Sequence, residues 1–231
     1  MPAFGRVPSP ADDRDYRLAA YQRGEPALAM FWGIGPILDQ GDFPACVGFG
    51  WVAWSNAAPV ENDYGNADAH AVYAECKAID GDDYPGSTVR SGAKAMRARG
   101  RLSAYAFGTL EDARRFILTQ GPVVFGTWWY EGMMEPDEHG VIHATGEPLE
   151  GHAYLVYGYE PGWWHMQQSW DGWGKNGCAR ISEADMARVF GFDGEACAAV
   201  ELPLTLARHH VLRRWYERLV IGLRRVFGNS L

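Results

Sequence analysis

The pattern of hydrophobic positions changes about halfway along the 231-residue chain. In the first half, apolar residues recur at the three- and four-residue spacing of helices. Val47, Trp51 and Trp54 share one face of a helix expected over residues 45–56, and Pro44 suits its start. Three further segments have a helical pattern: residues 67–79, 89–99 and 110–120.

In the second half, β-branched and aromatic residues gather in short runs that are typical of strands. Five such runs follow one another: residues 123–130, 152–160, 163–170, 178–182 and 197–203. Pro161 and Gly162 separate the second run from the third and indicate a turn. Because helices come first and strands later, the pattern predicts an α+β fold and not an alternating one.

Composition divides the chain into three parts. Residues 1–36 are rich in Pro, Gly and Asp and predict an irregular N-terminal lead-in, whereas residues 37–200 hold the periodic elements of a folded domain. Residues 201–231 carry six Arg and two Glu around the apolar face of an amphipathic helix. We expect this basic C-terminal helix to pack on its own domain or to dock a protein partner, in preference to a lipid surface.

Charge and cysteine content exclude several classes of protein. A formal net charge of −8 argues against a nucleic-acid binder, since neutralising phosphates needs a basic surface. No apolar run is long enough for a membrane span, and the N-terminus lacks the apolar core of a secretory signal. Four scattered cysteines do not form a disulfide framework. We therefore expect no nucleic-acid partner, no membrane association and a reducing, cytoplasmic setting.

Metal ligation has little support in the sequence. No CxxC pair is present. His139 and His143 are four residues apart beside acidic residues, but Gly140 argues against a helix that would bring the two rings together. We expect no metal and no other cofactor.

The strands on either side of the turn predict a histidine next to an amide. If the hairpin folds about Pro161, His152 and Tyr154 lie across from Trp170 and Gln168, with all four side chains on one face. An amide carbonyl can accept a hydrogen bond from one imidazole nitrogen and leave the other nitrogen free. Trp170 would then shield that bond from water.

Cys46 lies at the start of the first predicted helix, six residues after Gln40. A helix N-terminus together with a nearby imidazolium lowers a thiol pKa and favours the nucleophilic thiolate. Gln40 and the backbone N–H of Cys46 would provide two donors for an oxyanion. The alternative is that Cys46 is a small buried residue that fills the core.

Together these parts resemble the papain-like cysteine peptidases in three ordered blocks. "DQGDFPACVGFGW" is similar to the family's Gln–Cys block, "GHAYLVYGYE" to its His block, and "QQSWDGWGKNGCARI" to its Asn-Ser-Trp-Gly block. "GPVVFG" is similar to the strand that precedes the histidine. The resemblance covers residues 37–200.

The resemblance implies an α+β, two-lobed fold with a helical lobe at about residues 37–120 and an antiparallel, β-barrel-like lobe at about residues 121–200. It implies four catalytic residues, namely Cys46 as nucleophile, His152 as general base and acid, Gln168 as the group that orients the histidine, and Gln40 as oxyanion donor. It also implies four substrate-binding residues: Gly86, Ser87, Gly151 and Trp170.

The chain departs from the family pattern in places. Gln168 stands where the family usually has Asn, so its acceptor lies on a stem one methylene longer. We expect no inhibitory pro-segment of normal length ahead of Cys46. The compact pattern is more similar to bacterial or bacteriophage members than to lysosomal ones.

The resulting hypothesis is a thiol-dependent endopeptidase that acts on a peptide or protein substrate through a Cys–His acyl-enzyme. Two alternatives stay open. One is a papain-fold structural or binding component, for example of a phage particle or a bacterial assembly. For a phage component the expected location is the virion and not the cytoplasm. The other is a Cys–His amidase or transferase.

Overall fold

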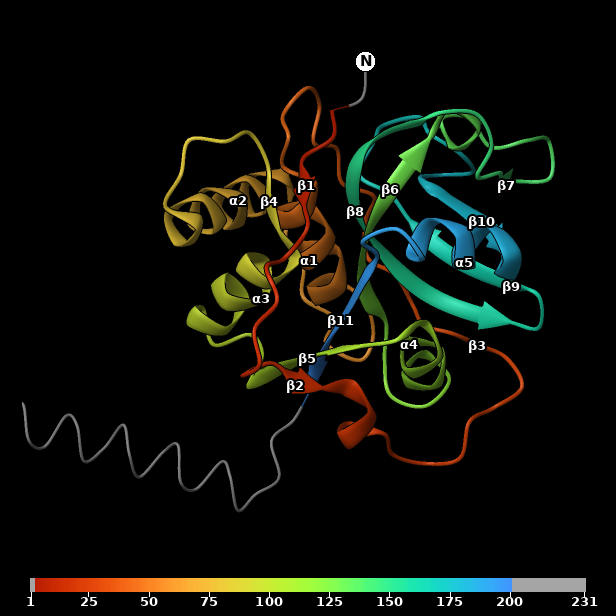
Figure 1. Ribbon diagram of the computed structural model, residues 1–231, viewed down its shortest axis with the longest axis horizontal. Helices are drawn as coiled ribbons and strands as arrows, with labels where there is room; N and C mark the ends of the chain where they lie inside the picture. The colour runs from red at the N-terminus through yellow and green to blue at the C-terminus, as the bar shows by residue number, and fades with distance from the viewer. Residues whose placement is uncertain (1–2, 201–231) are drawn as a thin grey trace, which may run out of the picture.

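The computed structural model describes residues 3–200, and helices lie on both sides of its main sheet (Figure 1). The described residues form five α-helices: α1 (Cys46–Asn56), α2 (Asn66–Asp80), α3 (Val89–Ala98), α4 (Leu110–Ile117) and α5 (Glu183–Phe190). The 3-10 helices are η1 (Leu18–Tyr21) and η2 (Glu131–Met133). The predicted C-terminal helix lies outside the described residues.

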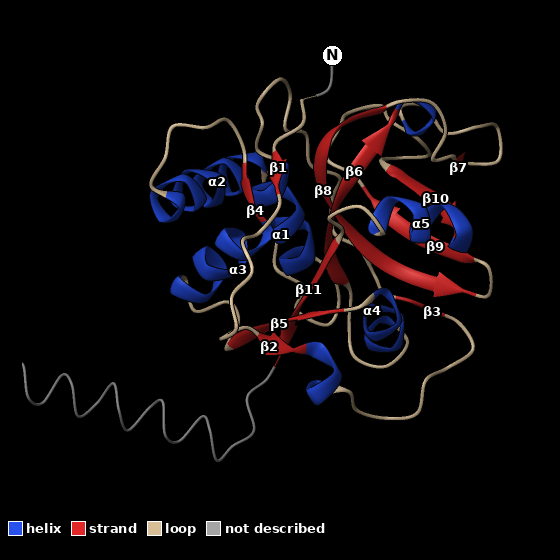
Figure 2. Cartoon of the chain, viewed as in Figure 1, coloured by secondary structure: helices blue, strands red, loops and turns tan. Residues whose placement is uncertain are grey.

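The strands form one main sheet and one short two-stranded sheet (Figure 2). The longer strands are β5 (Ala104–Gly108), β6 (Val123–Tyr130), β8 (Pro148–Glu160), β9 (Trp163–Gln167), β10 (Cys178–Ser182) and β11 (Glu195–Val200). The two-residue strands are β1 (Arg6–Val7), β2 (Tyr16–Arg17), β3 (Met30–Phe31), β4 (Ser87–Thr88) and β7 (Val141–Ile142). None of the helices within residues 3–200 has the length and apolar character needed to cross a membrane.

The main sheet is mostly antiparallel. Its strand order is β2-β5-β11-β6-β8-β9-β10-β7, with β3 added to β8. β2 runs parallel to β5, and β7 runs parallel to β10. Among the described strands the order does not return to its start, so the expected α+β class is confirmed, whereas a closed barrel is not formed.

Alternation along the central strands gives the sheet two buried faces. On β6 and β8, Val124 and Leu155 pack into a core shared with α1, α2 and α3. Phe125 and Val156 face the opposite way, into a core shared with α4 and α5. This period-two division places α1 directly against the backbone of β8.

Gly48 lets α1 approach α2 closely, whereas the contact of α1 with β8 would also admit a side chain at Gly50. A Cβ on Gly48 would come within 2.5 Å of the Ala69 carbonyl oxygen of α2, so only glycine fits at this crossing. A Cβ on Gly50 would lie 3.6 Å from the backbone nitrogen of Tyr154 in β8, which is ordinary contact. The first turn of α1 is thereby held between α2 and the sheet.

The hairpin prediction is confirmed for the half of the hairpin that lies nearer to His152. Leu155 pairs with Gln167 and Val156 pairs with Met166, as a turn centred on Pro161 requires. A bulge after Val156 shifts the outer pairs by one residue. β9 ends at Gln167, so Gln168 and Trp170 follow the strand and do not lie within it.

The two ends of the predicted helical region pack differently. α1, α2 and α3 form one helical cluster, but Phe116 and Ile117 of α4 pack into the core on the far face of the sheet. β5 pairs with β11 and is part of the main sheet. Both α4 and β5 lie within residues 37–120, so this range contributes to both layers.

Candidate active site

Cys46 is the first residue of α1, and its side chain is completely buried. Burial raises the pKa of the thiol to about 12, while the backbone N–H groups of Ala153 and Val47 and the Arg6 guanidinium act in the opposite direction. The expected lowering of the thiol pKa at a helix N-terminus is therefore wrong for this state. Since Ala153 directly follows His152, the contact places the sulfur next to the histidine-bearing strand.

His152 lies on β8 inside an aromatic enclosure. Its ring centroid is 4.5 Å from that of Trp170 and 5.2 Å from that of Trp129. Burial lowers the pKa of His152 to about 4, against the opposing effect of its hydrogen bond to Gln168. Burial therefore favours the neutral forms of both the Cys46 thiol and the His152 imidazole.

The His152 ring is held by one nitrogen. Its Nε2 lies 2.6 Å from Oε1 of Gln168, and both side chains are buried. Within residues 3–200, Nδ1 of His152 is buried and has no hydrogen-bond partner. If Nε2 donates to the amide oxygen, Nδ1 carries the lone pair. The longer glutamine stem thus reaches the histidine.

Ser169 connects the histidine side of the site to Gln40. Its backbone N–H donates to Oε1 of Gln168 at 3.3 Å, and its hydroxyl donates to Oε1 of Gln40 at 2.7 Å. The backbone N–H of Gln40 in turn donates to the Ser169 carbonyl at 2.9 Å. Sequence reasoning missed this role, although Ser169 stands inside the "QQSW" block.

Gln40 directs its amide nitrogen at two carbonyl groups. Nε2 donates to the Phe43 oxygen at 2.8 Å and to the Ala3 oxygen at 2.9 Å. Ser169 fixes which end of the amide faces inward, because its hydroxyl donates to Oε1. The predicted oxyanion donor therefore already holds a peptide carbonyl from the N-terminal segment.

That segment continues along the predicted substrate-binding residues. The backbone N–H of Gly5 donates to the Gly151 oxygen at 3.2 Å, and the Ser87 N–H donates to the Gly5 oxygen at 2.7 Å. The Phe4 ring lies 5.5 Å from that of Trp170. Figure 1 shows β1 passing between the helices and β8. We call residues 3–9 the cleft segment.

Three glycines allow the cleft segment to lie this close. A Cβ on Gly5 would fall 2.1 Å from the Pro44 oxygen, and one on Gly86 would fall 2.3 Å from the Gly5 oxygen. A Cβ on Gly151 would fall 2.2 Å from the Arg6 oxygen. All three distances are below any normal contact, so a larger residue at any of these positions would force the backbones apart.

The predicted N-terminal lead-in, residues 1–36, has only short elements in its described part, but it makes specific contacts with the rest of the protein. No normal-length pro-segment was expected before Cys46, yet part of the lead-in covers the site. Beyond residue 9, Arg90 pairs with Asp15 and donates to the Pro10 oxygen, which ties the chain that follows the cleft segment to α3. The Pro- and Gly-rich sequence has no periodicity that would have predicted these contacts.

Other candidate groups stay apart from the site. All four cysteines are free, so Cys178 and Cys197 do not pair. Within residues 3–200, no cluster of three or more His, Cys, Asp or Glu side chains could hold a metal. His143 contacts Asp137, with 3.2 Å between Nε2 and Oδ2.

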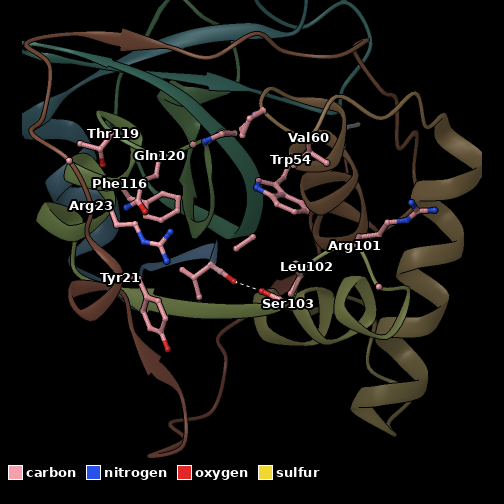
Figure 3. Close-up of a pocket in the computed structure, with 17 residues that line it drawn as sticks. Tyr21, Arg23, Trp54, Val60, Arg101, Leu102, Ser103, Phe116, Thr119 and Gln120 are labelled. Carbon is pink, nitrogen blue, oxygen red and sulfur yellow. Dashed lines mark hydrogen bonds between the residues drawn. The ribbon is translucent and has the colours of Figure 1, made fainter. Parts of the chain in front are cut away.

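A cavity of about 750 Å³ lies elsewhere, between the end of α1 and the end of α4 (Figure 3). Its lining includes Trp54 and Phe116, and neither Cys46 nor His152 is part of it. Residues 3–6 lie against Gln40 and Gly151 instead, so the open cavity and the candidate catalytic residues do not coincide.

By sequence, no protein-family model matches the chain, and no curated protein matches it. Solved structures do match. Xylellain, a cysteine protease from Xylella fastidiosa, superposes with a TM-score of 0.67 at 14% identity, over 87% of this chain and 97% of that one.

Two proenzymes match as well. The proCathepsin B S9 from Trypanosoma congolense gives a TM-score of 0.61 at 15% identity, over 87% of each chain. The digestive procathepsin L 3 of Tenebrio molitor also gives 0.61 at 15% identity, over 85% of this chain and 76% of that one. The chain therefore has the fold of the papain-like cysteine proteases, as its three sequence blocks predict.

Proposed function

We propose that the chain is a thiol-dependent peptidase in which Cys46 is the nucleophile, His152 the general base and acid, and Gln40 the oxyanion donor. One observation carries the proposal: the cleft beside Cys46 already binds an extended peptide. Gln40 holds the carbonyl of Ala3, and Gly151 and Ser87 hold the next peptide groups. A site that takes its own backbone in this way suits a peptide substrate.

In the proposed reaction, Nδ1 of His152 takes the proton of the Cys46 thiol, and the sulfur attacks the scissile carbonyl carbon. The oxygen of the tetrahedral intermediate accepts a hydrogen bond from Nε2 of Gln40. His152 then gives its proton to the leaving amine, and the C–N bond breaks to leave a thioester. Water, deprotonated by His152, hydrolyses that thioester and restores the thiol.

Gln168 and Ser169 act as positioning residues. Gln168 accepts from Nε2 of His152, which sets the ring orientation and stabilises the imidazolium when it forms. Ser169 holds both glutamine side chains through hydrogen bonds to their oxygens. The base and the oxyanion donor are thereby fixed relative to each other.

The cleft segment has to leave before a substrate enters. Residues 3–6 contact Gln40, Gly151, Ser87 and Trp170, the groups assigned here to substrate. Displacement would admit water and lower the desolvation that keeps Cys46 and His152 neutral. The segment thus restrains the activity.

Hydrolysis of a mixed pool of unstructured peptides by full-length protein tests the assignment, with Arg6→Ala as the background that weakens the cleft segment. We expect cleavage in this background and none after Cys46→Ala is added. Cys178→Ala is the matched control, because Cys178 is a free cysteine whose thiol contacts Tyr157, so its loss should leave cleavage unchanged. Equal cleavage with and without Cys46 would overturn the proposal.

A structural or binding role is the second candidate, and the neutral Cys46–His152 pair under the cleft segment favours it. Under that role the segment is a permanent part of the core. A folded Arg6→Ala protein that cleaves no peptide at all would support this second candidate over the first.

A further inference from the structure

The open cavity between α1 and α4 lies at the opposite end of α1 from Cys46. Its walls include the side chains of Trp54, Val60, Leu102 and Phe116 (Figure 3). Val60 is 37% exposed, although it is apolar and lines a hollow. Concave surfaces with apolar walls and a few polar groups are typical of binding sites. Because no residue of the candidate active site lines this cavity, its occupant has to be sought elsewhere.

The last described residues form part of the cavity wall. Ala199 and Val200, at the end of β11, both line it. Val200 pairs with Ala104 of β5, and its carbonyl accepts the Ser103 hydroxyl at 2.9 Å, so the course of β11 is fixed up to its last residue. Two residues of chain span at most about 7 Å. The Cα of Leu202 is therefore within about 7 Å of a lining residue in any conformation.

The alternation of side chains along β11 continues in the sequence beyond it. The even-numbered residues of β11 face the core shared with α4: Ala196, Ala198 and Val200. Phe116, a wall of the cavity, lies in that core. The even positions that follow are all leucine: Leu202, Leu204 and Leu206. Between them stand Pro203 and Thr205. If the chain stays extended, the leucines therefore point to the side of the sheet on which Phe116 lies.

The charges agree with this placement. Arg23 and Arg101 line the cavity, and no acidic residue does among the described residues of its wall. Glu201 is the first residue after Val200, and the arginines of the C-terminal part begin only at Arg208. The stretch that adjoins the cavity is thus apolar and acidic, whereas the wall is apolar and basic.

We propose that residues 201–206 of the chain's own C-terminal part occupy this cavity. Leu202 and Leu204 pack against Trp54 and Phe116, and Glu201 lies beside the arginines of the wall. The C-terminal part is thereby attached at the ends of α1 and α4. This inference does not depend on the peptidase proposal, because no residue of the candidate active site takes part in it.

Two other occupants would suit the same apolar walls, namely a second copy of the chain and an apolar ligand from solution. The three possibilities differ in what touches the lining. Only the proposed one brings Leu204 of the same chain against residues 54–60 or 116–122. A contact made by Leu204 therefore separates them.

Photo-cross-linking of the full-length protein tests this contact, with p-benzoylphenylalanine in place of Leu204 and mass spectrometry of the products. We expect cross-links within one chain to residues 54–60 or 116–122. The matched control carries the same group in place of Thr205, whose side chain points the other way, and should give at least about five-fold less of these cross-links.

Cross-links between two chains would overturn the proposal in favour of a second copy. Cross-links only to other regions, or none, would overturn it and leave the cavity to a ligand from solution. Because the photoreactive side chain is apolar, as leucine is, this measurement does not depend on a charged variant that fails to fold.

Thermal denaturation gives a second measure of the same contact. Leu204→Asp places a carboxylate among apolar walls and should lower Tm by about 5 °C or more. Thr205→Asp adds the same charge at the next position and should change Tm by less than about 2 °C. Equal shifts for the two variants would mean that Leu204 is not buried in the cavity, which would overturn the proposal.

Discussion

Two sets of contacts meet at the cleft, and they differ in kind. The His152–Gln168–Ser169–Gln40 network consists of neutral, buried hydrogen bonds between groups near β8, the end of β9 and the approach to α1. The cleft segment, by contrast, is held by ion pairs at its side chains and by backbone hydrogen bonds, as Arg6 with Glu195 shows. The network contains no charged side chain. The attachment of the segment, by contrast, depends on the ion pair between Arg6 and Glu195, which a single substitution breaks.

This difference indicates that the hydrogen-bond network is the fixed part and that the cleft segment is the part that can move. The network joins His152 and Gln40 through side-chain hydrogen bonds that do not involve the segment, so under the proposed function we expect these groups to keep their places when the segment leaves. The segment belongs to a region with two-residue strands and one 3-10 helix, which contributes little cooperative structure of its own. Substitutions can weaken either the network or the contacts of the cleft segment without changing the other.

Removing the amide of Gln40 should have the largest effect. Gln40→Ala in the Arg6→Ala background is expected to lower kcat for peptide cleavage by about 100- to 1,000-fold, as loss of one oxyanion donor does elsewhere. Steady-state kinetics measure it. Gln22→Ala is the control, since Gln22 is an amide far from the network that donates to the Asp112 carbonyl. An unchanged kcat would mean that another group holds the oxyanion.

Acid should act on the network through His152. Its pKa is about 4 in the folded protein against 6.5 when unfolded, so the neutral ring contributes stability above pH 6.5 that is lost as the pH falls toward 4. The shift corresponds to about 3 kcal/mol of unfolding free energy. Denaturant unfolding between pH 7 and 4 should show a steeper loss for the wild type than for His152→Phe. Parallel losses would place the ring in contact with water.

Shortening or deleting the Gln168 side chain tests whether its carbonyl orients the histidine. Gln168→Ala should lower kcat about 10- to 100-fold, as the loss of a group that orients a functional histidine typically does, while Gln168→Asn retains an acceptor and loses less. The pH dependence of kcat should shift with Ala and stay closer to wild type with Asn, which a purely structural role would not produce. Equal kcat for Ala and wild type would show that His152 is held by something else.

The outer anchor of the segment should have the smallest effect. Asp15→Asn breaks the largely buried pair with Arg90, but Arg90 still donates to the Pro10 oxygen, so we expect Cys46 to react with a small alkylating agent only about two- to five-fold faster. Asp13→Asn is the control because it removes the same charge two residues away, where the neighbouring ion pair joins Asp12 to Arg14 and not to α3. An acceleration as large as that of Arg6→Ala would move the main fastening point from Glu195 to Asp15.

The elements predicted correctly from the sequence are those with a strong internal pattern. β6 matches its predicted range because every residue of the run is β-branched, aromatic or small, and α1 follows from its apolar spacing. α5 was missed because its eight residues follow directly on β10, although Ser182 caps it through the Asp185 N–H. β5, with alternating alanines, was missed as well.

The catalytic candidates were predicted from local blocks, but the cleft segment was not. Cys46, His152 and Gln168 stand in recognisable blocks, and the structure brings the last two within hydrogen-bond distance. Arg6 and Glu195 are 189 residues apart, and nothing local to either predicts their contact. Such a pairing exists only after the sheet and the helices have formed, so no single-sequence pattern carries it.

The most direct test is the order in which the cysteines of the full-length protein react with an alkylating agent at neutral pH, followed by mass spectrometry. We expect slow labelling of Cys46 in the wild type and preferential labelling of Cys46, ahead of the half-buried Cys178, in Arg6→Ala. If Cys178 reacts first in both proteins and Cys46 stays unreactive in the folded variant, the central claim is contradicted, because the sulfur is then a core residue and not a covered nucleophile.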